Sequence, residues 1–131
     1  ALVLRPAVVL LDEPTVGLDA PAQLRLEAAL AAWRRQGRTV VLASHDLDFV
    51  AETADRVAVL AGGSVLADGA PEALLGDRAL LAGARLAPPS RLALAATLGV
   101  AAIGAGSRAA LWAALDERRF GAGRSGPPRY N

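Results

Sequence analysis

Polar residues follow two separate apolar runs in this sequence, and their types could support chemistry on a phosphate. Asp12 and Glu13 come directly after the first run, and Ser44 and His45 come directly after the second run, at residues 39–43. Short runs rich in valine and leucine are typical of strands buried on both faces of a parallel sheet. The carboxyl ends of such strands meet at the edge where α/β folds bind their ligands. The sequence therefore predicts that these four residues share one ligand-binding edge.

The two adjacent carboxylates can have different functions. Neighbouring residues on an extended chain point to opposite sides, so Asp12 can face a metal ion while Glu13 faces a water. Mg²⁺ prefers oxygen ligands and retains several waters, so one carboxylate together with phosphates suffices to hold it. A second carboxylate can orient or deprotonate an attacking water. Taken alone, the pair fits equally well a strand that ends in two solvated acids.

Asp19 and His45 each have a structural and a functional interpretation. Asp19 precedes Pro21, where a helix is expected to begin, so on its own it is best explained as a helix cap. His45 is the only histidine of the chain, and a lone histidine is more often structural. A neutral imidazole at a strand end can also donate a hydrogen bond to a phosphate oxygen.

The elements expected around these residues alternate between strands and helices. Gly62 and Gly63 are expected to form the tight turn of a hairpin, which indicates that the last two strands are antiparallel. Strand–helix–strand alternation before that turn is typical of an α/β domain with a parallel sheet. Strands are predicted at residues 7–11, 39–43, 56–61 and 64–68, and helices from about Pro21 to Gly37 and at residues 47–53.

The character of the sequence changes after Gly69. Short helices are predicted at residues 71–75 and 77–84, and two more are expected to begin at Ser90 and Ser107. The last residues are rich in Gly, Pro and Arg and are expected to be disordered. The expected organisation is a core at residues 1–69, a helical extension at residues 70–120 and a disordered tail at residues 121–131.

The composition argues against several classes of function. The chain has no Cys, which excludes disulfides and thiol chemistry. Aromatic residues make up only 4% and the net charge is +1, so we expect no nucleic acid partner. The apolar run at residues 92–105 is shorter than the roughly 20 residues that cross a bilayer, so it is expected to be a packed segment.

In combination, these features resemble the ATP-hydrolysing subunits of ABC transporters. Residues 8–13 match the family's Walker B strand, residues 16–19 match its D-loop, and His45 matches its switch histidine. The resemblance extends from about Val8 to Gly69. It implies an α/β fold that is a partial P-loop NTPase (ABC ATPase) domain, with a mainly parallel sheet and a C-terminal hairpin, followed by a small helical extension.

The resemblance also implies a role for each candidate residue, with ATP and Mg²⁺ as cofactors. Asp12 corresponds to the residue that holds Mg²⁺, and Glu13 corresponds to the catalytic glutamate. His45 would contact the γ-phosphate, and Ser44 beside it would contribute to nucleotide binding. Asp19 would reach across a dimer in which two subunits enclose the nucleotides.

Residues 69–75 are similar to a segment common to many importers, and residues 80–89 resemble the extension of energy-coupling factor importers of cobalt, nickel and vitamins. This implies an ATPase coupled to import of a metal ion or vitamin. The implied partners are a second ATPase subunit, identical or different, and a transmembrane subunit, with the chain peripheral at the cytoplasmic face of the cell membrane. Translation-associated and DNA-repair ATPases fit less well, although a non-transport ATPase of this type remains an alternative.

Several motifs of the family are not in this sequence. The phosphate-binding loop ends in Gly-Lys-Ser/Thr, and the chain contains no Lys. The glutamine loop, the Leu-Ser-Gly-Gly-Gln signature and the aromatic residue that stacks on adenine are also missing. Because the chain has no Met and begins at Ala1 near an apolar run, we expect a C-terminal piece of a longer subunit that is inactive alone. A truncated, non-catalytic module that docks on an ABC complex is the alternative.

In the family, the strand that leads to the phosphate loop lies between the strands predicted here at residues 39–43 and 56–61. Without that neighbour, buried backbone groups lose partners, each at a cost of about 1–3 kcal/mol. We therefore predict that a purified monomer of these 131 residues shows no cooperative thermal transition by circular dichroism. A single sharp transition would contradict the prediction.

Overall fold

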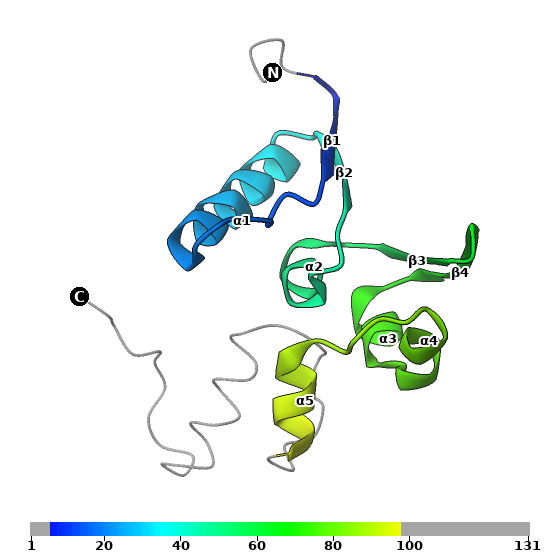
Figure 1. Ribbon diagram of the computed structural model, residues 1–131. Coiled ribbons are helices and arrows are strands. Elements are labelled where there is room, and N and C mark those ends of the chain that lie inside the picture. The colour runs from blue at the N-terminus through cyan, green and yellow to red at the C-terminus, as the bar shows by residue number, and fades with distance from the viewer. Residues whose placement is uncertain (1–5, 98–131) are drawn as a thin grey trace, which may run out of the picture.

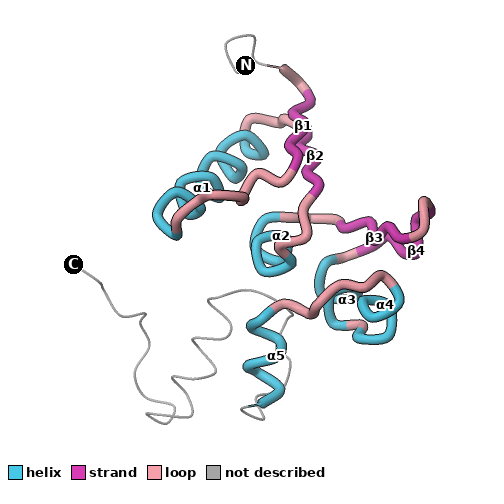
Figure 2. Tube along the Cα trace, in the orientation of Figure 1, coloured by secondary structure: helices cyan, strands magenta, loops and turns pink. Residues whose placement is uncertain are grey.

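The computed structural model describes residues 6–97, which form two small sheets and five helices of an α/β fold (Figures 1 and 2). The order of the elements agrees with the order predicted from the sequence. Along the chain they are β1 (Val8–Asp12), α1 (Ala20–Arg35), β2 (Thr39–Ala43), α2 (Leu47–Thr53), β3 (Val57–Ala61), β4 (Ser64–Gly69), α3 (Pro71–Gly76), α4 (Arg78–Gly83) and α5 (Ser90–Thr97).

β1 and β2 form a parallel pair connected through α1. Their register runs from Val8 opposite Thr39 to Asp12 opposite Ala43. The amide of Glu13 donates to the Ala43 carbonyl at 2.9 Å, so the ladder continues one residue beyond β1. Parallel strands need such a crossover connection, because a tight hairpin turn joins only antiparallel strands. The residues that follow the two strands therefore begin side by side.

α1 begins and ends at the signals predicted from the sequence. The Asp19 carboxylate accepts a hydrogen bond from the Ala22 amide at 2.8 Å, and Pro21 occupies the first turn. These features confirm the predicted cap. The helix ends at Arg35, and Gly37 follows with a φ of 76°, a left-handed conformation that favours glycine.

The prediction that the first two strands are buried on both faces was wrong for the described residues. Val9 on β1 is buried, whereas Val8, Leu10 and Val41 are 53%, 74% and 53% exposed. Figure 1 shows α1 beside the β1–β2 pair, and the opposite face of the pair is exposed. The high valine and leucine content does not distinguish a strand covered on two faces from one covered on one face.

β3 and β4 form the predicted antiparallel hairpin. Gly62 and Gly63 have φ angles of 58° and 77°, as a two-residue turn with two left-handed positions requires. In the described part of the chain, β1 pairs only with β2, and β3 pairs only with β4. This agrees with the expectation that β2 and β3 are not direct neighbours in the sheet.

α2 lies at the centre of the hydrophobic core. Its Leu47 and Val50 pack in one cluster with Leu75 of α3 and Leu81 of α4. Phe49 is fully buried, with 0% of its surface exposed. The predicted inward orientation of Phe49 and Val50 is therefore confirmed, and Figure 1 shows α2 between the β1–β2 pair and the two short helices.

The helices predicted after Gly69 agree with the structure as far as it describes them. α3 and α4 differ from the predicted ranges by one residue at their ends, and α5 begins at Ser90 as expected. The helix expected from Ser107 and the tail at residues 121–131 lie outside the described residues. Among residues 6–97, no helix is long and apolar enough to cross a membrane.

Candidate active site

Three of the predicted site residues are in contact where β1 and β2 end. Glu13 Oε1 lies 2.8 Å from His45 Nδ1, and Glu13 Oε2 accepts a longer hydrogen bond of 3.4 Å from the Ser44 hydroxyl. The same carboxylate therefore contacts two adjacent side chains that follow β2. Because Nδ1 faces Glu13, Nε2 is the nitrogen of His45 left to meet a further partner.

The segment from Ser44 to Asp46 is held by the start of α2. The Asp46 amide donates to Ser44 Oγ at 3.1 Å, and Asp46 Oδ1 accepts from the Phe49 amide at 3.0 Å. Asp46 is thus the N-cap of α2 and fixes the turn that carries His45. This cap was not predicted from the sequence, although an Asp three residues before Phe49 at the start of an apolar helix is a sufficient signal.

Glu13 has an unusual backbone conformation. Its φ is 42°, in the left-handed region that residues other than glycine seldom adopt. Two hydrogen bonds hold it there: its amide donates to the Ala43 carbonyl, and its carbonyl accepts from the Val16 amide at 3.2 Å. Strained backbone of this kind is often found at functional sites.

The backbone of Glu13 shows that the reason predicted for the different directions of the Asp12 and Glu13 carboxylates was wrong. Alternation along a strand was expected to separate Asp12 from Glu13, but β1 ends at Asp12. The direction of Glu13 is set by the left-handed turn that follows the strand and not by strand alternation.

Asp12 is exposed at the end of β1. Its carboxylate could bind a metal ion only if other groups supplied the remaining ligands. Within residues 6–97, no group of three or more His, Cys, Asp or Glu side chains is placed to hold a metal ion. The Asp12 carboxylate can supply one oxygen ligand. This fits Mg²⁺ when phosphates and waters provide the remaining ligands.

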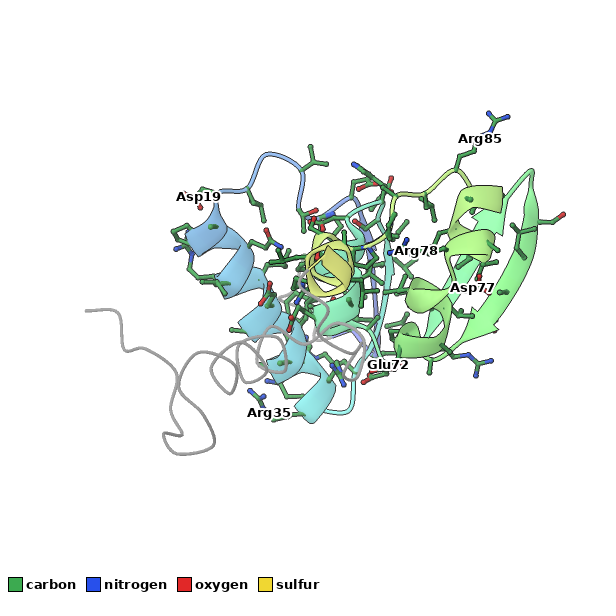
Figure 3. All side chains as sticks on the ribbon, turned by 90° about the horizontal axis from the view of Figure 1, so that it is seen from below. Asp19, Arg35, Glu72, Asp77, Arg78 and Arg85 are labelled. Carbon is green, nitrogen blue, oxygen red and sulfur yellow. The ribbon has the colours of Figure 1, made fainter. Side chains whose placement is uncertain are left out.

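Asp19 and Ser44, the two residues predicted to contribute to nucleotide binding, have different environments. Ser44 is in contact with Glu13, as described above. Asp19 lies at the N-terminal end of α1 (Figure 3), where its carboxylate is used in the helix cap. The capping interpretation of Asp19 is therefore confirmed, and its contribution to a nucleotide site stays a prediction.

Glu13 and His45 alter each other's protonation. The hydrogen bond to Glu13, and then its negative charge, raises the pKa of His45. The hydrogen bond to His45 lowers the pKa of Glu13. At neutral pH, His45 therefore holds a proton more readily than an isolated histidine does. The side chains are 72% and 37% exposed, so solvent screens this pair and it adds little to stability.

Known proteins align with most of this chain. No family model matches it. The cobalt import ATP-binding protein CbiO of Rhodobacter capsulatus is 47% identical over 95 residues, which are 72% of this chain and 34% of that protein. The energy-coupling factor transporter ATP-binding protein EcfA2 of Symbiobacterium thermophilum is 44% identical over 94 residues, which are 72% and 33% of the two chains.

A solved structure of an ABC transporter component also matches the fold of this chain. The structure of cbiO1 from Clostridium perfringens, described as part of the ABC transporter complex cbiONQ, matches with a TM-score of 0.53 and 32% identity. The match covers 71% of this chain and 38% of that chain. The fold is therefore that of part of a P-loop NTPase domain of the ABC type.

The sequence and structural matches together show that this chain belongs to the family of ABC transporter ATP-binding proteins. Among them it resembles the cobalt-import and energy-coupling factor proteins, as predicted. It spans about a third of the length of these relatives, with 34% and 33% of their residues covered.

The interaction between Glu13 and His45 can be tested by titration. We predict that Glu13→Gln lowers the pKa of His45, because the substitution removes the negative charge that favours the imidazolium. The measurement is a proton NMR titration of the complete subunit, in which the ring signals of His45 are assigned by their loss in His45→Ala. Glu72→Gln, a neutralised carboxylate on α3, serves as the control and should leave the titration unchanged. An equal pKa in the wild type and Glu13→Gln would contradict the pairing.

Proposed function

We propose that this chain is the C-terminal part of the ATP-hydrolysing subunit of an ABC transporter that imports a metal ion or a vitamin. The proposal depends on one observation above all, the 2.8 Å contact between the Glu13 carboxylate and His45, with Asp12 beside it at the end of the parallel strand pair. The substrate class is proposed from the names of the relatives, which include cobalt import and energy-coupling factor proteins.

Each residue of the site then has one task in ATP hydrolysis. Asp12 would hold Mg²⁺, which when bound neutralises charge on the phosphates. Glu13 would orient the attacking water and accept its proton. His45 would donate from Nε2 to the γ-phosphate, since its Nδ1 faces Glu13. Phosphoryl transfer depends mainly on such positioning and charge stabilisation.

We further propose that a second ATPase subunit, identical or different, packs against the loop between β1 and α1. Val16 and Leu18 in this loop are 67% and 40% exposed and provide apolar surface for a partner. Asp19, at the end of the loop, would reach toward the nucleotide in the other subunit. Together with a transmembrane subunit, the dimer would lie at the cytoplasmic face of the membrane.

The chain supplies residues for hydrolysis but has no Lys with which to form a phosphate-binding loop. We therefore propose that residues 1–131 alone do not hydrolyse ATP. The same observation favours a second candidate function, a non-catalytic module that docks on an intact ABC complex. Two measurements on the purified chain test these proposals. Hydrolysis of ATP would refute the proposed inactivity, and tight binding of a fluorescent ATP analogue would count against the non-catalytic docking module.

Glu13→Gln tests the proposed function in the complete subunit. We expect the variant to bind ATP with unchanged affinity and to hydrolyse it at least about 100-fold more slowly, because a general base typically contributes that much. The measurement is single-turnover hydrolysis with saturating ATP.

Glu72→Gln on α3 is the matched control for this experiment, since it neutralises a carboxylate of the same type on an element that follows β4 and not β1 or β2. It should hydrolyse ATP at the wild-type rate. A Glu13→Gln variant that also turned over near the wild-type rate would remove Glu13 from the role of base.

A further inference from the structure

A group of charged residues outside the site joins α5 to α2. Arg91 Nε donates to Asp48 Oδ1 at 3.0 Å, and the Ser90 amide donates to Asp48 Oδ2 at 2.9 Å. The two terminal nitrogens of Arg91 donate to Glu52 and to the Asp48 carbonyl. We call these four residues, Ser90, Arg91, Asp48 and Glu52, the Arg91 clamp. Figure 1 shows α5 next to α2 in accordance with these contacts.

The Arg91 clamp is better shielded from solvent than the other arginine–carboxylate pairs of the described chain. The Arg91 side chain is 14% exposed and that of Glu52 is 18% exposed, whereas Arg34 and Arg56 are 42% and 75% exposed in their ion pairs. Partial burial reduces the screening of charges by water, so the clamp should restrain its helices more than a surface pair does.

The carboxylates around the clamp indicate how Arg91 can stabilise the position of α2. A shallow pocket of about 240 Å³ lies beside the clamp, and it is lined by Glu27, Asp48 and Glu52 together with Arg91 as its only basic residue. Burial raises the pKa of Asp48, but the hydrogen bonds from Ser90 and Arg91 outweigh burial and lower it. Without the guanidinium, carboxylates of α1 and α2 would face one another in a partly dehydrated space.

A path that combines hydrogen bonds with the backbone of the first turn of α2 leads from the clamp to the site. Asp48 lies in the first turn of α2, two residues after the cap Asp46. The Asp46 amide donates to Ser44 Oγ, and the Ser44 hydroxyl donates to Glu13. His45 lies between Ser44 and Asp46, so a displacement of the first turn of α2 would move the imidazole.

We propose that Arg91 is a positioning residue for ATP hydrolysis, which holds the first turn of α2 and thereby keeps His45 and Ser44 against Glu13. Arg91 itself is not expected to touch the nucleotide. By this route the C-terminal extension would set the rate of the chemical step. The inference rests on the proposed function, because it assumes that Glu13 and His45 act in hydrolysis.

The first test is Arg91→Gln in the complete subunit. We expect the single-turnover rate at saturating ATP to fall roughly tenfold, since a misplacement of about 1 Å can cost about 100-fold and the loosened turn keeps its Asp46 cap. The dissociation constant for ATP should change by less than about twofold relative to the wild type. A slower chemical step with nearly unchanged binding distinguishes a positioning effect from loss of the nucleotide site.

A second measurement separates positioning through His45 from a general loss of structure. In a His45→Ala background, Arg91→Gln should have a much smaller effect on the rate, because one of the two residues through which Arg91 acts is gone. Arg91→Lys should restore only part of the rate, because an ammonium cannot form the several directed contacts of the guanidinium. An equal loss in both backgrounds, or no loss in Arg91→Gln, would overturn the proposal.

Arg56→Gln is the matched control. Arg56 makes a two-pronged ion pair with Asp68 at 2.7 and 3.0 Å, but this pair joins β4 to the residue before β3 and has no hydrogen-bonded path to His45. Loss of the Arg56 side chain in this variant should leave the hydrolysis rate unchanged.

Asp48→Asn weakens the clamp from the α2 side. It is measured in parallel, so that misfolding of Arg91→Gln alone does not decide the outcome. An unimpaired rate in Asp48→Asn would count against the clamp.

Amide hydrogen exchange separates failure of this inference from failure of the proposed function. If the wild-type subunit hydrolyses no ATP, the proposed function is wrong. Exchange at residues 44–50 still tests the clamp: it should be faster in Arg91→Gln than in the wild type and unchanged in Arg56→Gln. Equal exchange in all three proteins would refute the role of Arg91 independently of any activity.

Discussion

The parallel ladder between β1 and β2 is the constraint on which the candidate site depends. It aligns Asp12 with Ala43 and adds one more hydrogen bond, from the Glu13 amide to the Ala43 carbonyl. That last bond holds Glu13 in its left-handed conformation and brings its carboxylate to His45. A slip of one residue would reverse the faces of the strand and separate the two side chains.

α2 links this edge to the rest of the molecule. Its cap, Asp46, fixes the turn that carries His45, while Phe49 and Val50 anchor the helix in the core. Asp48 on the same short helix binds Arg91 of α5. A helix of seven residues therefore connects the site, the hydrophobic core and the C-terminal extension. This connection is the physical basis of the proposal that Arg91 positions the histidine.

Much of this arrangement could be predicted because its signals are local. Valine-rich runs gave β1 and β2 within one residue, Asp19 and Pro21 gave the start of α1, and the Gly62–Gly63 pair gave the hairpin. The order of strands and helices then placed the polar strand ends at one edge. The roles proposed for these residues in hydrolysis are implied by the resemblance to the family and were not dictated by the pattern itself.

The remaining features depend on contacts between distant parts of the chain. Glu13 and His45 are 32 residues apart, and Asp48 and Arg91 are 43 residues apart. The sequence predicted that Glu13 and His45 share an edge of the sheet, but not that their side chains are in contact. No periodicity or cap reveals the pairing of Asp48 with Arg91. The left-handed backbone of Glu13 and the exposed faces of Val8 and Leu10 are likewise consequences of tertiary structure.

The most direct test of the account is a structure of the complete subunit with a non-hydrolysable ATP analogue and Mg²⁺. We predict that the Glu13 carboxylate lies within hydrogen-bonding distance of a water in line with the γ-phosphate, and that His45 Nε2 contacts a γ-phosphate oxygen. A structure in which another residue holds that water while Glu13 points to solvent and His45 lies away from the phosphate would contradict it.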